Sequence, residues 1–162
     1  MTVRSLGTAL ASKLHAEHLK VLGFKKSGAT FSRARNGYVE SLNLQGSSWN
    51  SGEEPWLFYV NIQVLFTDLP DVTEKVRNMK YHAEGRLESI VPESPSRFEL
   101  TAANLGEIVG QVSVLSQSAS ARLPGLLAPL RSRASRGLYS PIPLPAAWAA
   151  TDDARAEPID SA

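Results

Sequence analysis

The sequence of residues 23–66 is GFKKSGATFSRARNGYVESLNLQGSSWNSGEEPWLFYVNIQVLF, and it contains a helix stop, a hairpin and a third strand in unbroken order. Asn36-Gly37 is a strong hairpin signal, because a type I′ turn needs positive φ at both central residues and these two residue types tolerate it. A two-residue loop places Phe31 opposite Leu42, and it places Arg33 opposite Glu40 as a cross-strand charge pair. The stretch therefore predicts an antiparallel hairpin with a defined register.

Side chains alternate across the predicted strands, so each face of the sheet has its own chemistry. A slip of one residue would bury the amides and expose the aromatic rings, so the register is strongly specified. An antiparallel meander with one buried and one wet face is the simplest arrangement. The apolar face carries Ala29, Phe31, Leu42, Leu44, Phe58, Val60, Ile62, Val64 and Phe66.

The opposite face carries amides, hydroxyls and one phenol in place of the charged residues that usually cover a solvated strand. Such groups are costly to bury unless their hydrogen bonds are satisfied. The face is either a solvated surface, partly covered by a loop or tail, or an uncharged platform that binds a partner or small ligand. Trp49, in the following loop, is either a wall of that platform or a lid on the core. The candidate binding residues are Ser41, Asn43, Gln45, Trp49, Tyr59, Asn61 and Gln63.

Helical patterns flank this stretch. Apolar residues recur at helical spacing over 3–22 and over 102–122, and Gly23 fits the position that follows a helix end. Residues 126–136 predict a further turn or two of helix. We therefore expect the α+β class, with an antiparallel meander sheet of about four or five strands and two long helices packed on one face.

The remaining segments give weaker signals. Residues 71–81 are a candidate helix, and residues 86–91 and 97–100 are candidate short strands. Past residue 138 the chain is rich in Pro, Ala and acidic residues. We expect one α+β domain over 1–138 and an extended or disordered tail over 139–162, in which Ile142, Leu144 and Trp148 are candidates for docking on the body.

Three segments together resemble a bacterial domain-of-unknown-function family of small α+β proteins. Its pattern is GFKK-x-G-x-TF, then Q-x-S-x-W-x-x-G, then a strand with V-N-I, and the resemblance spans roughly residues 8–130. It implies a small α+β domain with no established activity, so no catalytic residue is carried over. Gln45 and Asn61 are motif positions on the polar face. The matching segments are residues 23–31, 44–52 and 58–62.

Composition excludes several classes of chemistry. The chain has no cysteine, which excludes disulfides, thiolate catalysis and cysteine-ligated metals. His15 and His18 are three residues apart, but two surface histidines explain them better than a metal site. There is no P-loop, no G-x-G-x-x-G and no G-x-S-x-G elbow. We expect no catalytic residue, no metal ligand and no cofactor.

Charge and hydropathy limit the partners. The net charge is +1, and its basic surplus is scattered over the body while the tail is acidic, so we do not expect a nucleic-acid partner. No apolar run is long enough to cross a membrane, and the N-terminus lacks the apolar core of a signal peptide. We expect a soluble, cytoplasmic protein without a membrane partner.

Two functions are consistent with these sequence features. The first is a non-enzymatic binding module that recognises another protein through the polar face, with toxin neutralisation as one form of it by analogy alone. The second is a small-ligand-binding protein or enzyme with its site between the polar face, Trp49 and residues 68–97.

Overall fold

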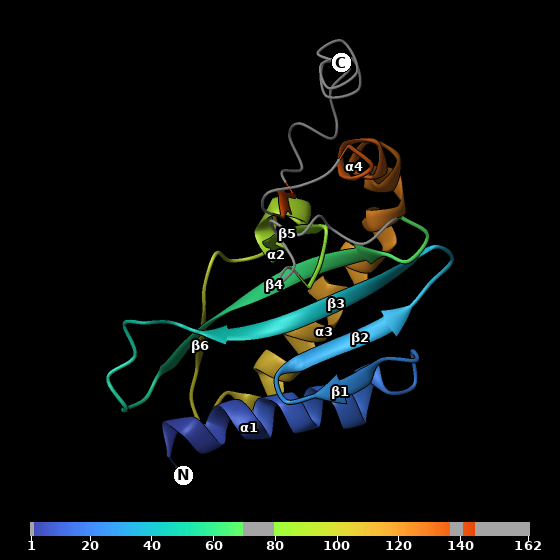
Figure 1. Ribbon diagram of the computed structural model, residues 1–162. Coiled ribbons are helices and arrows are strands. Elements are labelled where there is room, and N and C mark those ends of the chain that lie inside the picture. Colours follow the sequence, from blue (N-terminus) through green and yellow to red (C-terminus); the bar gives the residue numbers. More distant parts are fainter. Residues whose placement is uncertain (1, 70–79, 137–140, 145–162) are drawn as a thin grey trace.

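The computed structural model describes residues 2–69, 80–136 and 141–144 and shows an α+β fold. An open, mostly antiparallel sheet runs through the molecule, with helix α1 (Val3–Leu14) below it and helix α3 (Leu105–Arg122) behind it in Figure 1. The predicted fold class is confirmed.

The sheet has seven strands in the described part of the chain. The central pair is the long β3 (Tyr38–Gly46) and β4 (Trp56–Phe66), which form nine register pairs. Neighbours in the order β1-β2-β3-β4-β5 are antiparallel, β7 pairs with β5 in parallel, and β6 pairs with the start of β4. The remaining strands are β1 (Lys25–Ser27), β2 (Thr30–Ala34), β5 (Ala83–Arg86), β6 (Phe98–Leu100) and β7 (Ile142–Pro143).

The predicted hairpin register is confirmed, but the predicted turn type is wrong. Phe31 pairs with Leu42 and Arg33 with Glu40. Among the described residues only glycines have positive φ, so Asn36 does not, whereas Gly37 has φ of 85°. A type I′ turn needs both values positive. The carbonyl of Gly37 accepts a hydrogen bond from Thr67 N at 3.0 Å, so a tertiary contact also holds this turn.

The N-terminal helix ends as predicted at Gly23. After α1, a π-helical turn (His15–Leu19) continues the chain. Gly23 has φ of 94°, Phe24 N bonds to the carbonyl of Leu19, and Gly23 N bonds to that of Lys20. These two bonds define a Schellman motif, which turns the chain from the helix into β1.

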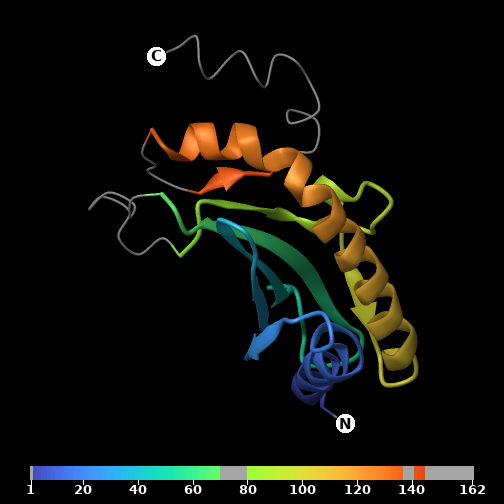
Figure 2. The same cartoon turned by 90° about the vertical axis from the view of Figure 1, so that its right-hand side faces the viewer.

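The second helical region is also close to its predicted bounds. Helix α3 is followed by a 3₁₀ turn (Leu123–Leu126) and by α4 (Leu127–Ala134). Both long helices lie on one side of the sheet, and in Figure 2 no helix of the described residues covers its other side. The predicted apolar face is confirmed as the core: Phe31, Phe58 and Val64 are fully buried there.

The segment between residues 67 and 100 corrects one prediction. The predicted strand over 86–91 is wrong, because β5 ends at Arg86 and residues Leu87–Ile90 form the short helix α2. Leu87 and Ile90 are both buried, and their spacing of three residues is helical. The strand predicted at 97–100 is present as β6, whereas the helix predicted at 71–81 lies almost wholly outside the described residues, as does Trp148.

Candidate functional site

The polar face of the sheet is the side opposite α1 and α3. Strand register places its side chains in rows that cross β2, β3, β4 and β5. One row aligns Asn43, Asn61 and Arg86, and a second aligns Ser41, Gln63 and Glu84. We define the polar face as Thr30, Ser32, Ser41, Asn43, Gln45, Tyr59, Asn61, Gln63, Glu84 and Arg86.

A ladder of hydrogen bonds links the amides of the polar face. Asn43 Nδ2 donates to Thr30 Oγ1 at 2.9 Å. Asn61 Nδ2 donates to Asn43 Oδ1 at 3.1 Å and to Gln45 Oε1 at 2.9 Å. Asn61 is only 6% exposed, so its two donated bonds are needed to offset its burial. This residue fixes the side-chain conformation of both of its neighbours on β3.

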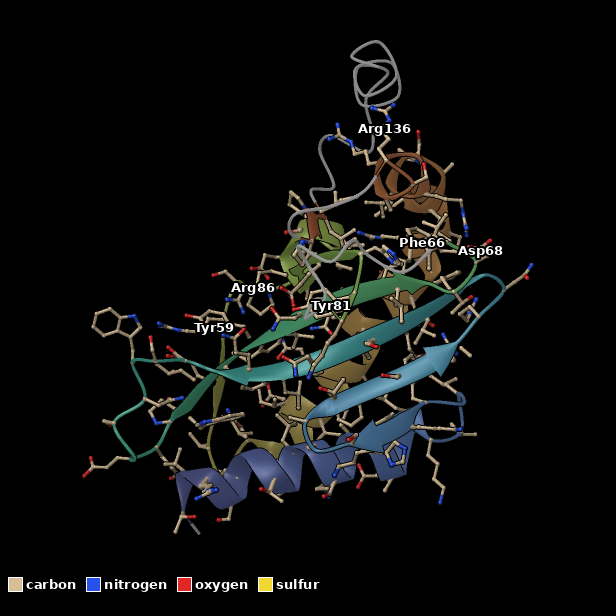
Figure 3. The ribbon with its side chains drawn as sticks, viewed as in Figure 1. Tyr59, Phe66, Asp68, Tyr81, Arg86 and Arg136 are labelled. Carbon is tan, nitrogen blue, oxygen red and sulfur yellow. The ribbon has the colours of Figure 1, made fainter. Side chains whose placement is uncertain are left out.

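An arginine and a tyrosine stack beside the ladder. The guanidinium of Arg86 lies over the ring of Tyr59, with Cζ 4.0 Å from the ring centroid, as Figure 3 lets the reader follow. Arg86 Nη1 also donates to Gln45 Oε1 at 3.3 Å. The stack joins β4 to β5 and places a delocalised cation over an aromatic surface.

The second row ends in Glu84, the carboxylate of the polar face. Ser32 and Ser41 share a hydrogen bond of 2.8 Å, and Gln63 Nε2 donates to Glu84 Oε2 at 2.8 Å. Burial raises the pKa of the Tyr81 phenol, and its hydrogen bond to Glu84 raises the pKa further. The phenol therefore keeps its proton, which it shares with the Glu84 carboxylate.

Many polar atoms of the face keep unused bonding capacity. Within the described part of the chain, Gln45 Nε2, Gln63 Oε1 and the Tyr59 hydroxyl have no hydrogen bond. All three side chains are at least partly exposed. The face can thus offer both donors and acceptors to a molecule that lies on it, while its internal bonds keep the side chains in place.

Every predicted site residue except Trp49 lies in the polar face. Trp49 sits in the loop between β3 and β4, with its side chain 82% exposed. The loop itself is anchored: Asn50 bonds to both the N–H and the carbonyl of Leu57, at 2.8 and 2.9 Å, and Trp49 N donates to Ser47 Oγ. The alternative in which Trp49 is a lid on the core does not fit this exposure.

Sequence reasoning left Glu84 and Arg86 out of the site. Their strand, β5, has only four residues, and the sequence pattern placed a strand three residues later. The register Asn61↔Arg86 and Gln63↔Glu84 was the missing information.

The other features considered are His15, groups of metal-binding side chains and membrane-crossing helices. His15 Nε2 lies 2.9 Å from the carbonyl of Phe24, and its ring stacks on Phe31. In residues 2–69, 80–136 and 141–144 there is no group of three or more His, Asp or Glu that could hold a metal ion. No helix of those same segments has the length and apolar character needed to cross a membrane.

Comparison with known proteins gives a family but no activity. A comparison with curated proteins found no match, and one with solved structures found none either. The family model described as a domain of unknown function, DUF4304, matches residues 15–119. That segment includes β1 to β6 and most of α3, and therefore the whole polar face. The chain belongs to the DUF4304 domain family.

Proposed function

We propose that this protein is a recognition module that binds another protein through the polar face. The observation that carries the proposal is the hydrogen-bonded ladder on a sheet face that no helix of the described residues covers. Side chains already fixed by internal bonds lose little conformational freedom when a partner docks. Unused amide donors and acceptors then penalise a partner that leaves them unpaired, which gives specificity.

The composition of the exposed groups supports the same proposal. Trp, Tyr and Arg are the residue types most enriched at the energetic centres of protein interfaces. Tyr59 of β4 and Arg86 of β5 are stacked within the polar face, and Trp49 is exposed on the anchored loop between β3 and β4. These residues would act as anchors, and the surrounding amides would set the register of the partner.

The edges of the sheet favour binding by the face over binding by strand addition. The edge strand β1 has only three residues and carries Lys25 and Lys26, and the outer strand β7 has two and contains Pro143. Short edges with lysine or proline are poor templates for an added strand. A partner that meets this sheet would therefore contact side chains of the polar face.

Toxin neutralisation is a more specific version of this proposal and rests on analogy with other small α+β domains. A toxin gene beside the gene for this chain would support it. The alternative of a small-ligand or enzyme site between the polar face, Trp49 and residues 68–97 stays a prediction, because residues 70–79 of that segment lie outside those described.

The experiment isolates partners from a lysate of the source organism on immobilised protein and measures the affinity of each. The double variant Tyr59→Ala/Arg86→Ala and the single variant Gln45→Ala test the polar face. Removing a hot-spot residue costs about 2 kcal/mol or more, so we expect at least a roughly 30-fold weaker Kd for the double variant.

The matched control is Glu107→Ala/Gln111→Ala, which removes one charged and one polar side chain from the exposed surface of α3. This control should bind the partner like the wild type. A partner that binds both face variants at wild-type affinity, with their fold intact by circular dichroism, would show that the polar face is not the recognition surface.

A further inference from the structure

A cavity of about 570 Å³ lies on the helix side of the sheet and is partly open to solvent. Its walls come from the first turns of α1, from the β1–β2 turn and from the loop between β3 and β4. The volume falls within the range of small-molecule sites. None of its lining residues belongs to the polar face, so what it binds is independent of the function proposed above.

Small side chains leave this space open. Gly7 and Ala11 of α1 and Ala29 of the β1–β2 turn line the cavity, while Leu6 and Leu10 of the same helix are fully buried in the core. Protein interiors are close-packed, and voids much larger than a water molecule are few. A preformed apolar space of this size beside the core is the common setting of a ligand site.

One wall of the cavity is the indole of Trp56, and two glycines fix its position. A Cβ added at Gly7 would lie 3.1 Å from Trp56 Cη2, and one added at Gly46 would lie 3.1 Å from Trp56 Cζ2. The indole also stacks on Phe58, with ring centroids 5.1 Å apart. The wall is therefore rigid and flat, and it needs no rearrangement to receive an apolar group.

The charges at the cavity are all positive. Among the described residues, Arg4 and Lys26 are the only charged ones that line it, and none of its lining residues there is a carboxylate. Neither cation belongs to an ion pair within the described part of the chain. The first turn of α1 contains no acidic residue, so the positive end of the helix dipole adds to the two cations. The apolar walls thus meet a rim that is complementary to one anionic group.

We propose that this cavity binds an amphipathic monocarboxylate, such as a medium-chain fatty acid. The apolar chain lies against Trp56, Leu44 and Ala29, and Arg4 and Lys26 hold the carboxylate at the rim. A neutral amphiphile would fill the cavity without using the two cations, and a cationic amphiphile would be repelled by them.

Decanoate and decylammonium, both kept below their micellar concentrations, are the probes for this proposal. They share a chain length and differ in the sign of the head group. Titration of the full chain is followed by calorimetry and by the NMR signals of the Trp56 indole and the Gly7 and Ala29 amides. Decanoate should bind saturably and shift these signals, and decylammonium should not.

Two kinds of variant separate the head-group contact from the cavity itself. Arg4→Gln/Lys26→Gln should weaken decanoate binding about tenfold, since each exposed cation contributes a modest attraction. The control Lys20→Gln/Lys25→Gln removes the same number of exposed cations from positions that do not line the cavity, and affinity should change less than roughly twofold. Thr8→Phe, on the exposed rim of α1, should fill the space and abolish binding.

Several results would overturn the proposal. One is the absence of saturable decanoate binding, and another is binding of decylammonium as tight as that of decanoate. Wild-type affinity for decanoate in Arg4→Gln/Lys26→Gln or in Thr8→Phe would have the same consequence. These outcomes would not contradict protein binding by the polar face. Likewise, failure of a protein to bind the polar face would not contradict carboxylate binding in the cavity.

Discussion

At the scale of single residues, Glu40 links the hairpin to a distant helix. Its side chain is 5% exposed and lies on the helix side of the sheet, where Arg33 Nε donates to Oε1 at 2.7 Å. Ser120 of α3 donates to Oε2 at 2.8 Å. The hairpin register predicts the Arg33–Glu40 pair, but Ser120 is 80 residues further along the chain, and no local pattern indicates it. A buried carboxylate needs such partners to offset its desolvation.

His82 is the buried titratable residue that couples stability to pH. It is 4% exposed, and its Nδ1 accepts a hydrogen bond from Phe66 N at 3.0 Å. An acceptor nitrogen carries no proton, so this bond requires the neutral ring. Burial lowers the pKa of His82 below its ordinary value of 6.5. As pH falls through that ordinary value, the unfolded chain takes up a proton more readily than the folded protein does.

We therefore predict that the free energy of unfolding decreases as pH falls from about 7.5 to about 5.5, by at most about 1.4 kcal/mol per pH unit from this residue. His82→Asn places an amide oxygen near the position of Nδ1 and does not titrate, so its unfolding free energy should change less with pH. Urea unfolding at each pH measures both proteins. Equal pH slopes for the wild type and His82→Asn would contradict the assignment.

At the scale of elements, β7 is held on the sheet where a glycine makes room for it. Ile142 N donates to the carbonyl of His82 at 2.8 Å, and Leu144 N donates to that of Glu84 at 3.0 Å. A Cβ on Gly85 would lie 2.6 Å from Leu144 Cβ and 3.0 Å from the Leu144 carbonyl oxygen. The side chains of Ile142 and Leu144 are buried, so the segment docks on the body through these contacts.

Gly85→Ala should force β7 away from β5, with a loss of about 1–3 kcal/mol typical of overpacking. Hydrogen exchange at the Ile142 and Leu144 amides should speed up. The matched control is Gly110→Ala in α3, where an added Cβ meets nothing within 4 Å. That change should stabilise the protein by about 0.5–1 kcal/mol. Unchanged protection of both amides in Gly85→Ala would show that β7 does not depend on this contact.

The elements differ in how far the sequence predicts them. Strands β2, β3 and β4 alternate over most of their length, with Val39, Leu57 and Leu65 as apolar exceptions on the polar side, so their register and faces follow from local pattern. The two long helices follow for the same reason, with Gly23 marking one end. The β5–α2 segment does not, because two apolar residues at helical spacing, Leu87 and Ile90, are too short a run to identify a helix, and the strand β5 depends on pairing with β4.

At the scale of the whole molecule, the core extends beyond the segment that the family model matches. Residues 15–119 exclude all of α1, whose Leu6, Leu10 and Leu14 are fully buried. They also exclude Leu130 of α4 and Ile142 of β7, both buried. The matched segment therefore contains the polar face but lacks part of the hydrophobic core that packs against the sheet.

A protein trimmed to residues 15–119 should not unfold cooperatively. Each large buried side chain contributes about 1.5–3 kcal/mol, and removing several of them exceeds the 5–15 kcal/mol that typically stabilises a domain. Calorimetry should show one transition for the full chain and none for the trimmed protein. A sharp transition in the trimmed protein would mean that the matched segment folds alone.

The polar face and the cavity differ in how far the sequence predicts them. Period-two alternation along β3 and β4 predicts the amides of the polar face, because neighbouring strands share one pleat. The cavity at Trp56 was not predicted. It arises where α1, the β1–β2 turn and the β3–β4 loop meet, and only tertiary packing brings these elements together.

Strand β4 contributes to both surfaces, since Trp56 lines the cavity and Tyr59 belongs to the polar face. Even-numbered positions of this strand project into the helical layer, and odd-numbered positions project away from it. In saturation mutagenesis along β4, an even or odd residue number is therefore enough to tell which of the two surfaces a substitution affects. Evolution could likewise alter one surface while leaving the other intact, one alternate position at a time.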